Sequence, residues 1–151
     1  MTVEQIPHMP FGLDKASDLG KIEIKLAFHG AKTGAGREEM TLWGDGRIRL
    51  YFSRSDQDKA PKIVEGTCES ERILRLLDFM EGNGVMDGPD HVGQKPAGST
   101  RELEIILPDR KKRILLQDTG DYSVEQVIGA VKLAAGQCIP EALNHRLFPN
   151  L

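Results

Sequence analysis

The stretch MTLWGDGRIRL, residues 40–50, decides the fold, because it reads as two alternating strands joined by a glycine-rich turn. A two-residue turn would place Leu42 opposite Arg49, so that apolar and charged side chains would share one face of the hairpin. A three-residue turn at 44–46 places Leu42 opposite Ile48 and keeps the apolar side chains together. We therefore expect the three-residue turn.

This register has consequences for the opposite face of the hairpin. It places Gly46 in the left-handed conformation, which glycine adopts without steric cost. It also sets Trp43 beside Arg47, where a cation–π contact could form, and puts Tyr51 on the same side as Trp43. Two aromatic side chains are therefore expected on the face that does not enter the core.

The chain on either side of this hairpin supplies further elements. Residues 21–29 alternate between apolar and charged side chains, which is typical of a half-buried strand. A short strand is expected at 62–66, followed by a helix with Thr67 as its N-cap and Gly82 or Gly84 at its end. The apolar stripe of that helix consists of Ile73, Leu76, Leu77 and Met80.

A second hairpin is expected from Thr100 to Asp118. Its turn lacks the usual glycine, so we set the register by matching apolar faces, which pairs Leu107 with Ile114 and Ile105 with Leu116. In this register Ile106 meets Leu115 on the opposite face, the same face that carries Trp43 and Tyr51 in the first hairpin. A partly apolar outer face is the result.

The C-terminal region reads as a second long helix. It starts at Tyr122, where Ser123 and Gln126 can cap reciprocally, and it ends at Gly136, before a short last helix from Pro140. The order of hairpins and helices predicts an α+β fold, with an antiparallel sheet and two main helices packed on one face as a two-layer sandwich. We expect residues 1–20 to form an irregular N-terminal arm and residues 21–151 to form a single α+β domain.

The composition excludes several classes of function. The 151 residues are 39% hydrophobic and 28% charged, as in a globular protein, and the net charge of −3 argues against general binding to nucleic acid or anionic lipid. No apolar stretch is long enough for a transmembrane segment, and the start of the chain lacks the features of a signal peptide. Cys68 and Cys138 are seventy residues apart without metal-ligand spacing, so we expect two free thiols in a cytoplasmic protein.

Candidate catalytic residues gather in one long segment, Gly82–Gly98, which has no periodicity. Asp87, Asp90 and His91 could supply a general base or metal ligands for a small hydrolytic or metal-dependent enzyme. A metal normally takes three or four ligands, and no nucleophile is near, so we expect ordinary loop polarity with neither metal nor cofactor. The basic run Arg110–Arg113 reads as a solvated turn next to acidic residues and predicts no nucleic-acid binding.

The turn Leu42-Trp43-Gly44-Asp45-Gly46-Arg47, followed by a helix such as Glu71 to Met80, a loop, further strands and a C-terminal helix, resembles two groups of proteins. These are small bacterial α+β domains of unknown function and the emfourin-like protease inhibitors. The resemblance spans roughly residues 21–136. It implies a bacterial α+β domain and, as one alternative function, a protease-inhibitor-like activity.

The residues themselves favour a non-enzymatic cytoplasmic binding module. Its ligand would be an apolar or amphipathic, lipid-like small molecule or a protein partner, and a homodimer is one form of the latter. The ligand would lie on the apolar surface of the sheet or between the sheet and the helices. The residues expected to bind it are Trp43, Tyr51, Ile106, Leu115 and Arg47.

Overall fold

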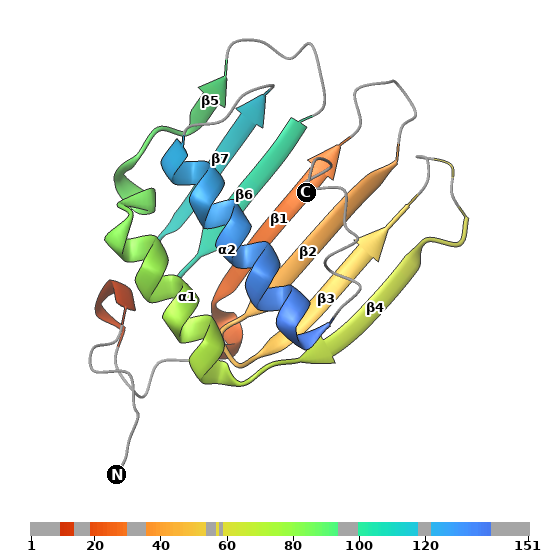
Figure 1. The fold of residues 1–151 in the computed structure, drawn as a ribbon, viewed down its shortest axis with the longest axis horizontal. Helices are drawn as coiled ribbons and strands as arrows, with labels where there is room; N and C mark the ends of the chain where they lie inside the picture. The colour runs from red at the N-terminus through yellow and green to blue at the C-terminus, as the bar shows by residue number, and fades with distance from the viewer. Residues whose placement is uncertain are drawn as a thin grey trace.

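The computed structural model describes residues 10–13, 19–29, 36–53, 57, 59–93, 100–117 and 122–139. These residues form one seven-stranded sheet in the order β4-β3-β2-β1-β6-β7-β5 (Figure 1). The strands are β1 (Glu23–His29), β2 (Arg37–Trp43), β3 (Arg47–Phe52), β4 (Lys62–Thr67), β5 (His91–Gly93), β6 (Thr100–Ile106) and β7 (Lys111–Gln117). Six strands pair antiparallel and β5 joins β7 in parallel.

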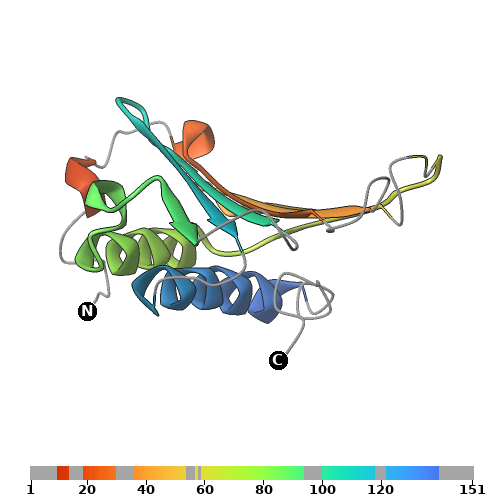
Figure 2. The ribbon, with the colours of Figure 1, turned by 90° about the horizontal axis from the view of Figure 1, so that it is seen from above.

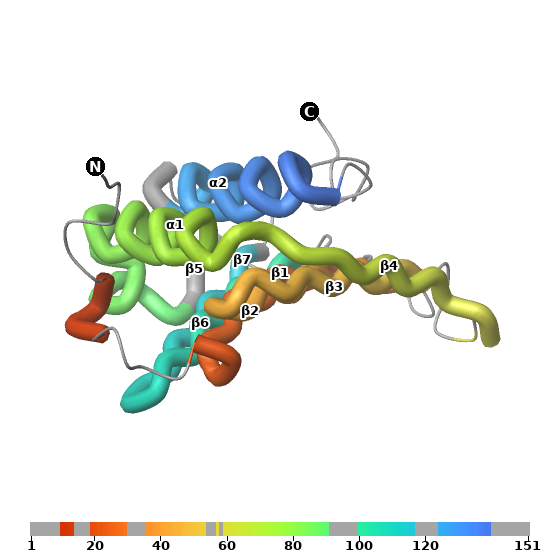
Figure 3. Tube along the Cα trace, turned by 90° about the horizontal axis from the view of Figure 1, so that it is seen from below, coloured from red at the N-terminus to blue at the C-terminus, as the bar shows by residue number. Residues whose placement is uncertain are grey.

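Two long helices, α1 (Ser70–Gly82) and α2 (Tyr122–Cys138), lie side by side on one face of the sheet (Figure 2). This confirms the predicted α+β fold with an antiparallel sheet and helices on one side. We call the other side of the sheet the open face. The tube in Figure 3 shows both helices on the same side of the strands. No helix within the described ranges has the length and apolar character needed to cross a bilayer.

The core lies between the sheet and the helices. The inward side chains of the central strands are fully buried, as expected from their alternation, and the apolar stripe of α1 closes over them. These side chains pack against one another, so this layer is the hydrophobic core of the protein. Its largest buried members include Ile24, Leu26, Met40, Leu42, Ile48, Leu50, Ile73, Leu77, Leu103 and Ile105.

The first hairpin has the predicted register. Leu42 pairs with Ile48 and Met40 pairs with Leu50, across a three-residue turn in which the N–H of Gly46 donates to the carbonyl of Trp43. The φ angle of Gly46 is 101°, so it occupies the left-handed region as expected. The requirement to keep apolar side chains on one face therefore predicted the correct turn.

The predicted register of the second hairpin is wrong. Ile105 pairs with Lys112, and Ile106 pairs with Lys111 instead of meeting Leu115. The cause is a tighter turn, in which the N–H of Leu107 donates to the carbonyl of Arg110 across Pro108 and Asp109. Proline pre-sets the φ angle of the first central turn position, so this dipeptide carried the register signal that face matching missed.

The long segment after α1 is more ordered than expected. It contains a 3-10 turn, η3 (Val85–Asp87), and the parallel edge strand β5. The carbonyl of Asp90 accepts a hydrogen bond from the N–H of Leu115, which fixes the start of β5 on β7. Three residues are too few for periodicity to reveal a strand, and this explains the missed element.

Two predicted helix boundaries are also corrected. Thr67 is the last residue of β4 and not a helix cap, because α1 starts at Ser70. The Ser70 hydroxyl instead donates to the Gly44 carbonyl at 2.7 Å and joins α1 to the first hairpin. Gly136 lies inside α2, which continues to Cys138. The short helix expected from Pro140 lies outside the described residues.

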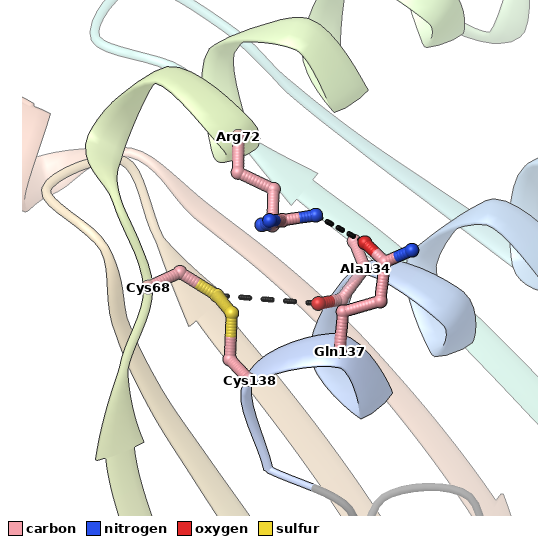
Figure 4. Close-up of a disulfide and its surroundings, with 5 residues drawn as sticks. All are labelled: Cys68, Arg72, Ala134, Gln137 and Cys138. Atoms are coloured by element: carbon pink, nitrogen blue, oxygen red, sulfur yellow. Dashed lines mark hydrogen bonds between the residues drawn. A yellow bond between two sulfur atoms is a disulfide. The ribbon is translucent and has the colours of Figure 1, made fainter.

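Cys68 and Cys138 form a disulfide, which contradicts the two predicted free thiols (Figure 4). The end of β4 and the end of α2 meet, and the two Cα atoms lie 5.7 Å apart. Beside the disulfide, the guanidinium of Arg72 on α1 donates to the side-chain oxygen of Gln137 on α2. Disulfides persist mainly in oxidising compartments, so the argument for a cytoplasmic location from free thiols is lost.

Two segments of the N-terminal arm are described as 3-10 turns, η1 (Pro10–Gly12) and η2 (Leu19–Lys21). η1 packs against α1, on the helix side of the molecule. η2 lies against the first hairpin, where the N–H of Gly44 donates to the carbonyl of Ile22.

Candidate binding site on the open face of the sheet

The open face over β1, β2 and β3 forms a regular grid of side chains, because the three strands are paired in register. In the middle row, Thr41 of β2 lies between Arg49 of β3 and Lys25 of β1. Strand alternation sends these three side chains to the same side of the sheet. The short threonine thus stands between two long cationic side chains.

This difference in side-chain length produces a hollow of about 340 Å³ centred on β2. Thr41 is 7% exposed, because the longer side chains around it rise above its methyl and hydroxyl groups. We call this site the hollow, and it is lined by Glu23, Lys25, Arg37, Glu39, Thr41, Trp43, Arg49 and Tyr51.

Trp43 and Tyr51, the two aromatic residues of the hollow, are each accompanied by an arginine. The Arg47 guanidinium lies 4.6 Å from the centre of the Trp43 ring, which confirms the predicted contact. Arg47 is held there by Asp45 at 3.0 Å and by the carbonyl of Gly20 at 3.2 Å. This arrangement fixes one face of the indole, while the side chain as a whole remains partly exposed.

The second aromatic residue, Tyr51, has a looser neighbour. The Arg37 guanidinium lies 6.0 Å from the centre of the Tyr51 ring and forms an ion pair with Glu39 on the same strand. Tyr51 also pairs across the sheet with Ile63 of β4, whose side chain is 48% exposed. An apolar surface thus extends from the hollow toward the edge strand.

Only some of the charged side chains of the hollow form ion pairs. Its lining holds three cations and two carboxylates, so it is slightly positive on a chain of net charge −3. Arg37 and Glu39 pair with each other. Within the described ranges, neither Arg49 nor Lys25 forms an ion pair with a carboxylate. Glu104 lies beside Lys25 on β6 but pairs with Lys111 at 3.6 Å, and Glu65 lies opposite Arg49 on β4 without an ion pair to it.

Of the other three predicted binding residues, Arg47 contacts Trp43 without lining this hollow, and Ile106 and Leu115 lie away from it. Glu23 separates Ile106 from Trp43 in the same row of the sheet. Leu115 lies on β7 and lines a different hollow of about 430 Å³ with Asp90 and three basic residues, Lys111, Lys112 and Arg113. The structure therefore places Trp43 and Tyr51 in the lining of one hollow, two rows of the sheet apart, and leaves Ile106 and Leu115 outside it.

Of the three candidate catalytic residues, Asp90 forms a contact with the sheet. The Asp90 carboxylate accepts a hydrogen bond from Lys112 at 2.6 Å, which ties the segment after α1 to β7. Asp87 is exposed in η3, and His91 is the first residue of β5. Across the portion of the chain that the structure describes, no group of three or more His, Cys, Asp and Glu side chains is placed to hold a metal ion.

The basic run after the second turn is largely neutralised. Arg113 pairs with Glu102, and Lys111 pairs with Glu104 on the neighbouring strand. Arg110 lies 5.5 Å from the centre of the Phe11 ring. These contacts fit the expected solvated turn next to acidic residues.

A buried charged pair lies on the other side of the sheet. Lys132 of α2 is 5% exposed and Glu38 of β2 is 4% exposed. Burial lowers the pKa of Lys132, because the charged ammonium loses its hydration, and the Glu38 carboxylate opposes this shift. Both residues belong to the layer between the sheet and α2 and not to the hollow.

The sequence identified the aromatic residues of the hollow but missed its polar ones. Lys25, Thr41 and Arg49 look like the solvated half of an alternating strand. Only the pairing of β1 with β2 places Lys25 beside Thr41, and the 30–36 connection between those strands carries no register signal. The one signal that the sequence does carry is the short side chain of Thr41 between two longer side chains on the same face of its strand.

No protein-family model matches this chain, and a search of curated proteins finds no similar sequence. The resemblance to the emfourin-like inhibitors and to small bacterial α+β domains therefore stays a prediction.

Proposed function

We propose that this protein is a non-enzymatic binding module that holds an amphipathic small molecule in the hollow on its open face. One observation carries the proposal: Trp43 and Tyr51 line a hollow whose floor is a threonine and whose other side chains are charged. Ligand sites typically combine aromatic surface with a few polar groups in a volume of about 300–1,000 Å³. The hollow lies within this range.

The fixed position of Trp43 supports this function. Arg47 holds one side of the indole, so a ligand can use the other side without first ordering a mobile ring. Ordering a side chain on binding costs about 0.5–1.5 kcal/mol, which a pre-positioned ring avoids. The core between the sheet and the helices is filled by the protein's own side chains, so we assign the ligand to the open face.

A neutral aromatic probe, N-phenyl-1-naphthylamine, tests the proposal, because its fluorescence rises when it leaves water. We expect the purified protein to bind it, and we expect Trp43→Glu to weaken binding about tenfold. This magnitude follows if about 60 Å² of ring contact is lost at about 25 cal/mol per Å². Native mass spectrometry of the same sample would report the subunit number and any molecule carried through purification.

The matched control is Leu115→Glu, which introduces the same charge on the same face of the sheet but outside the hollow. We expect this variant to bind the probe as the unmodified protein does. Thermal unfolding of both variants checks that the fold is intact. Equal binding by the Trp43→Glu variant and the unmodified protein would contradict the proposed site.

A further inference from the structure

We infer that the ligand of the hollow is an amphipathic organic anion, a free molecule whose carboxylate, sulfonate or phosphate group binds between Arg49 and Lys25. The inference rests on the proposed function and adds the charge of the ligand to it. The two cations face each other across Thr41 in one row of the sheet. A group that accepts hydrogen bonds from both sides fits this position.

Arg37, the third cation of the hollow, has a carboxylate partner, which leaves Arg49 and Lys25 as the recognition groups for an anion. Arg37 is paired with Glu39, and outside the hollow Arg47 is paired with Asp45. For Arg49 and Lys25, the described residues provide no carboxylate in ion-pair contact. Two cations that repel each other across a short residue are stabilised by a bound anion.

The position of Trp43 relative to these cations requires an amphipathic molecule. Trp43 follows Thr41 by two residues on β2, so its ring stands about 7 Å along the strand from the cationic row. A bound anion would therefore need a flat or apolar group in the row next to its charge. Glu23 stands beside Trp43 in that row and disfavours a second negative charge there.

The hydroxyl of Thr41 adds a donor at the floor of the hollow. A threonine hydroxyl can donate one hydrogen bond, and Arg49 offers a planar fork that matches a carboxylate or phosphate. Charge-assisted hydrogen bonds of this kind are stronger than neutral ones. The chain is acidic overall, so the positive hollow selects anions locally and not by the field of the whole protein.

A pair of probes with and without a charge tests the inference. The anion 1-anilinonaphthalene-8-sulfonate and the neutral N-phenyl-1-naphthylamine share the same ring system. We expect the anion to bind about tenfold more tightly than the neutral probe, and raised salt to weaken only the anion. We expect Arg49→Gln combined with Lys25→Gln to remove this preference, so that the variant binds the two probes with similar affinity.

Two further variants complete the experiment. Arg75→Gln changes the net charge at an exposed position of α1, away from the open face, and should leave the preference intact. Arg49→Lys keeps the positive charge and should retain most of the preference for the anionic probe. If both probes bind equally to the unmodified protein, the anion inference is overturned while the proposed function stands. If neither probe binds, both are overturned.

Discussion

Thr41 shows how a single short residue can define a site. The alternation of β2 sends it to the open face, where its neighbours on the same strand and on the adjacent strands are longer, and the hollow results from that difference. Within β2, Thr41 differs from the other outward-facing residues only in being shorter, and this alone does not predict a site. Its role depends on neighbours that come from two other regions of the chain, which is why the sequence did not identify it.

Gly46 is a residue whose backbone cannot accept a side chain. Its φ is 101°, and an added Cβ would stand 2.1 Å from the carbonyl oxygen of Cys68. We expect Gly46→Ala to lower the free energy of unfolding by more than about 1 kcal/mol. The matched control is Gly129→Ala in α2, where an added Cβ meets nothing within 4 Å. That change should stabilise the protein by about 0.5–1 kcal/mol, and urea unfolding of both variants would reveal the opposite signs.

Glu38→Gln tests the buried pair through its pH dependence. Burial lowers the pKa of Lys132 below 10.5 and Glu38 opposes this, so the variant leaves the burial effect unopposed. We expect a loss of about 1–3 kcal/mol near pH 7. Between the lowered pKa of Lys132 in the folded protein and its pKa in the unfolded chain, the unfolded chain binds more protons, so the free energy of unfolding rises with pH. This rise is larger in the variant, because its Lys132 pKa is lowered further, so the loss should shrink toward about pH 10. A loss that is the same in urea unfolding at both pH values would contradict this reasoning.

At the scale of elements, the two hairpins show what a sequence can and cannot reveal. In the first, only one turn keeps apolar side chains on one face, so the pattern around Leu42 and Ile48 sufficed. In the second, more than one register satisfies the faces, and the turn at Pro108 and Asp109 decides between them. Strand β5 is too short to carry a pattern and depends on its neighbour β7.

The disulfide joins two elements that the sequence left unconnected. Cys68 follows the edge strand β4, and Cys138 ends α2. We expect a reductant or Cys138→Ser to lower the free energy of unfolding by about 2–5 kcal/mol. Unfolding in urea with and without reductant measures this loss, and a variant with both cysteines replaced by serine should not respond to reductant. Two alkylatable thiols in the native, unreduced protein would contradict the disulfide.

At the scale of the whole molecule, the sheet has two different faces. One is sealed by α1 and α2 over a continuous apolar core. The other is mainly charged, and its apolar residues are separated by charged ones, such as Glu23 between Trp43 and Ile106. The sequence predicted the sealed face almost completely, because core positions follow simple alternation. It located only the aromatic residues of the open-face site, because the rest depends on the order of strands.

The central claim is that a small molecule binds in the hollow beside Trp43, and a nuclear magnetic resonance titration tests it most directly. The chain has a single tryptophan, so its indole N–H gives one assignable signal. On addition of N-phenyl-1-naphthylamine, we expect this signal and the backbone amides of Lys25, Thr41 and Arg49 to shift together and saturate. Shifts that gather elsewhere, for example around Leu115, or an indole signal that stays in place, would contradict the account.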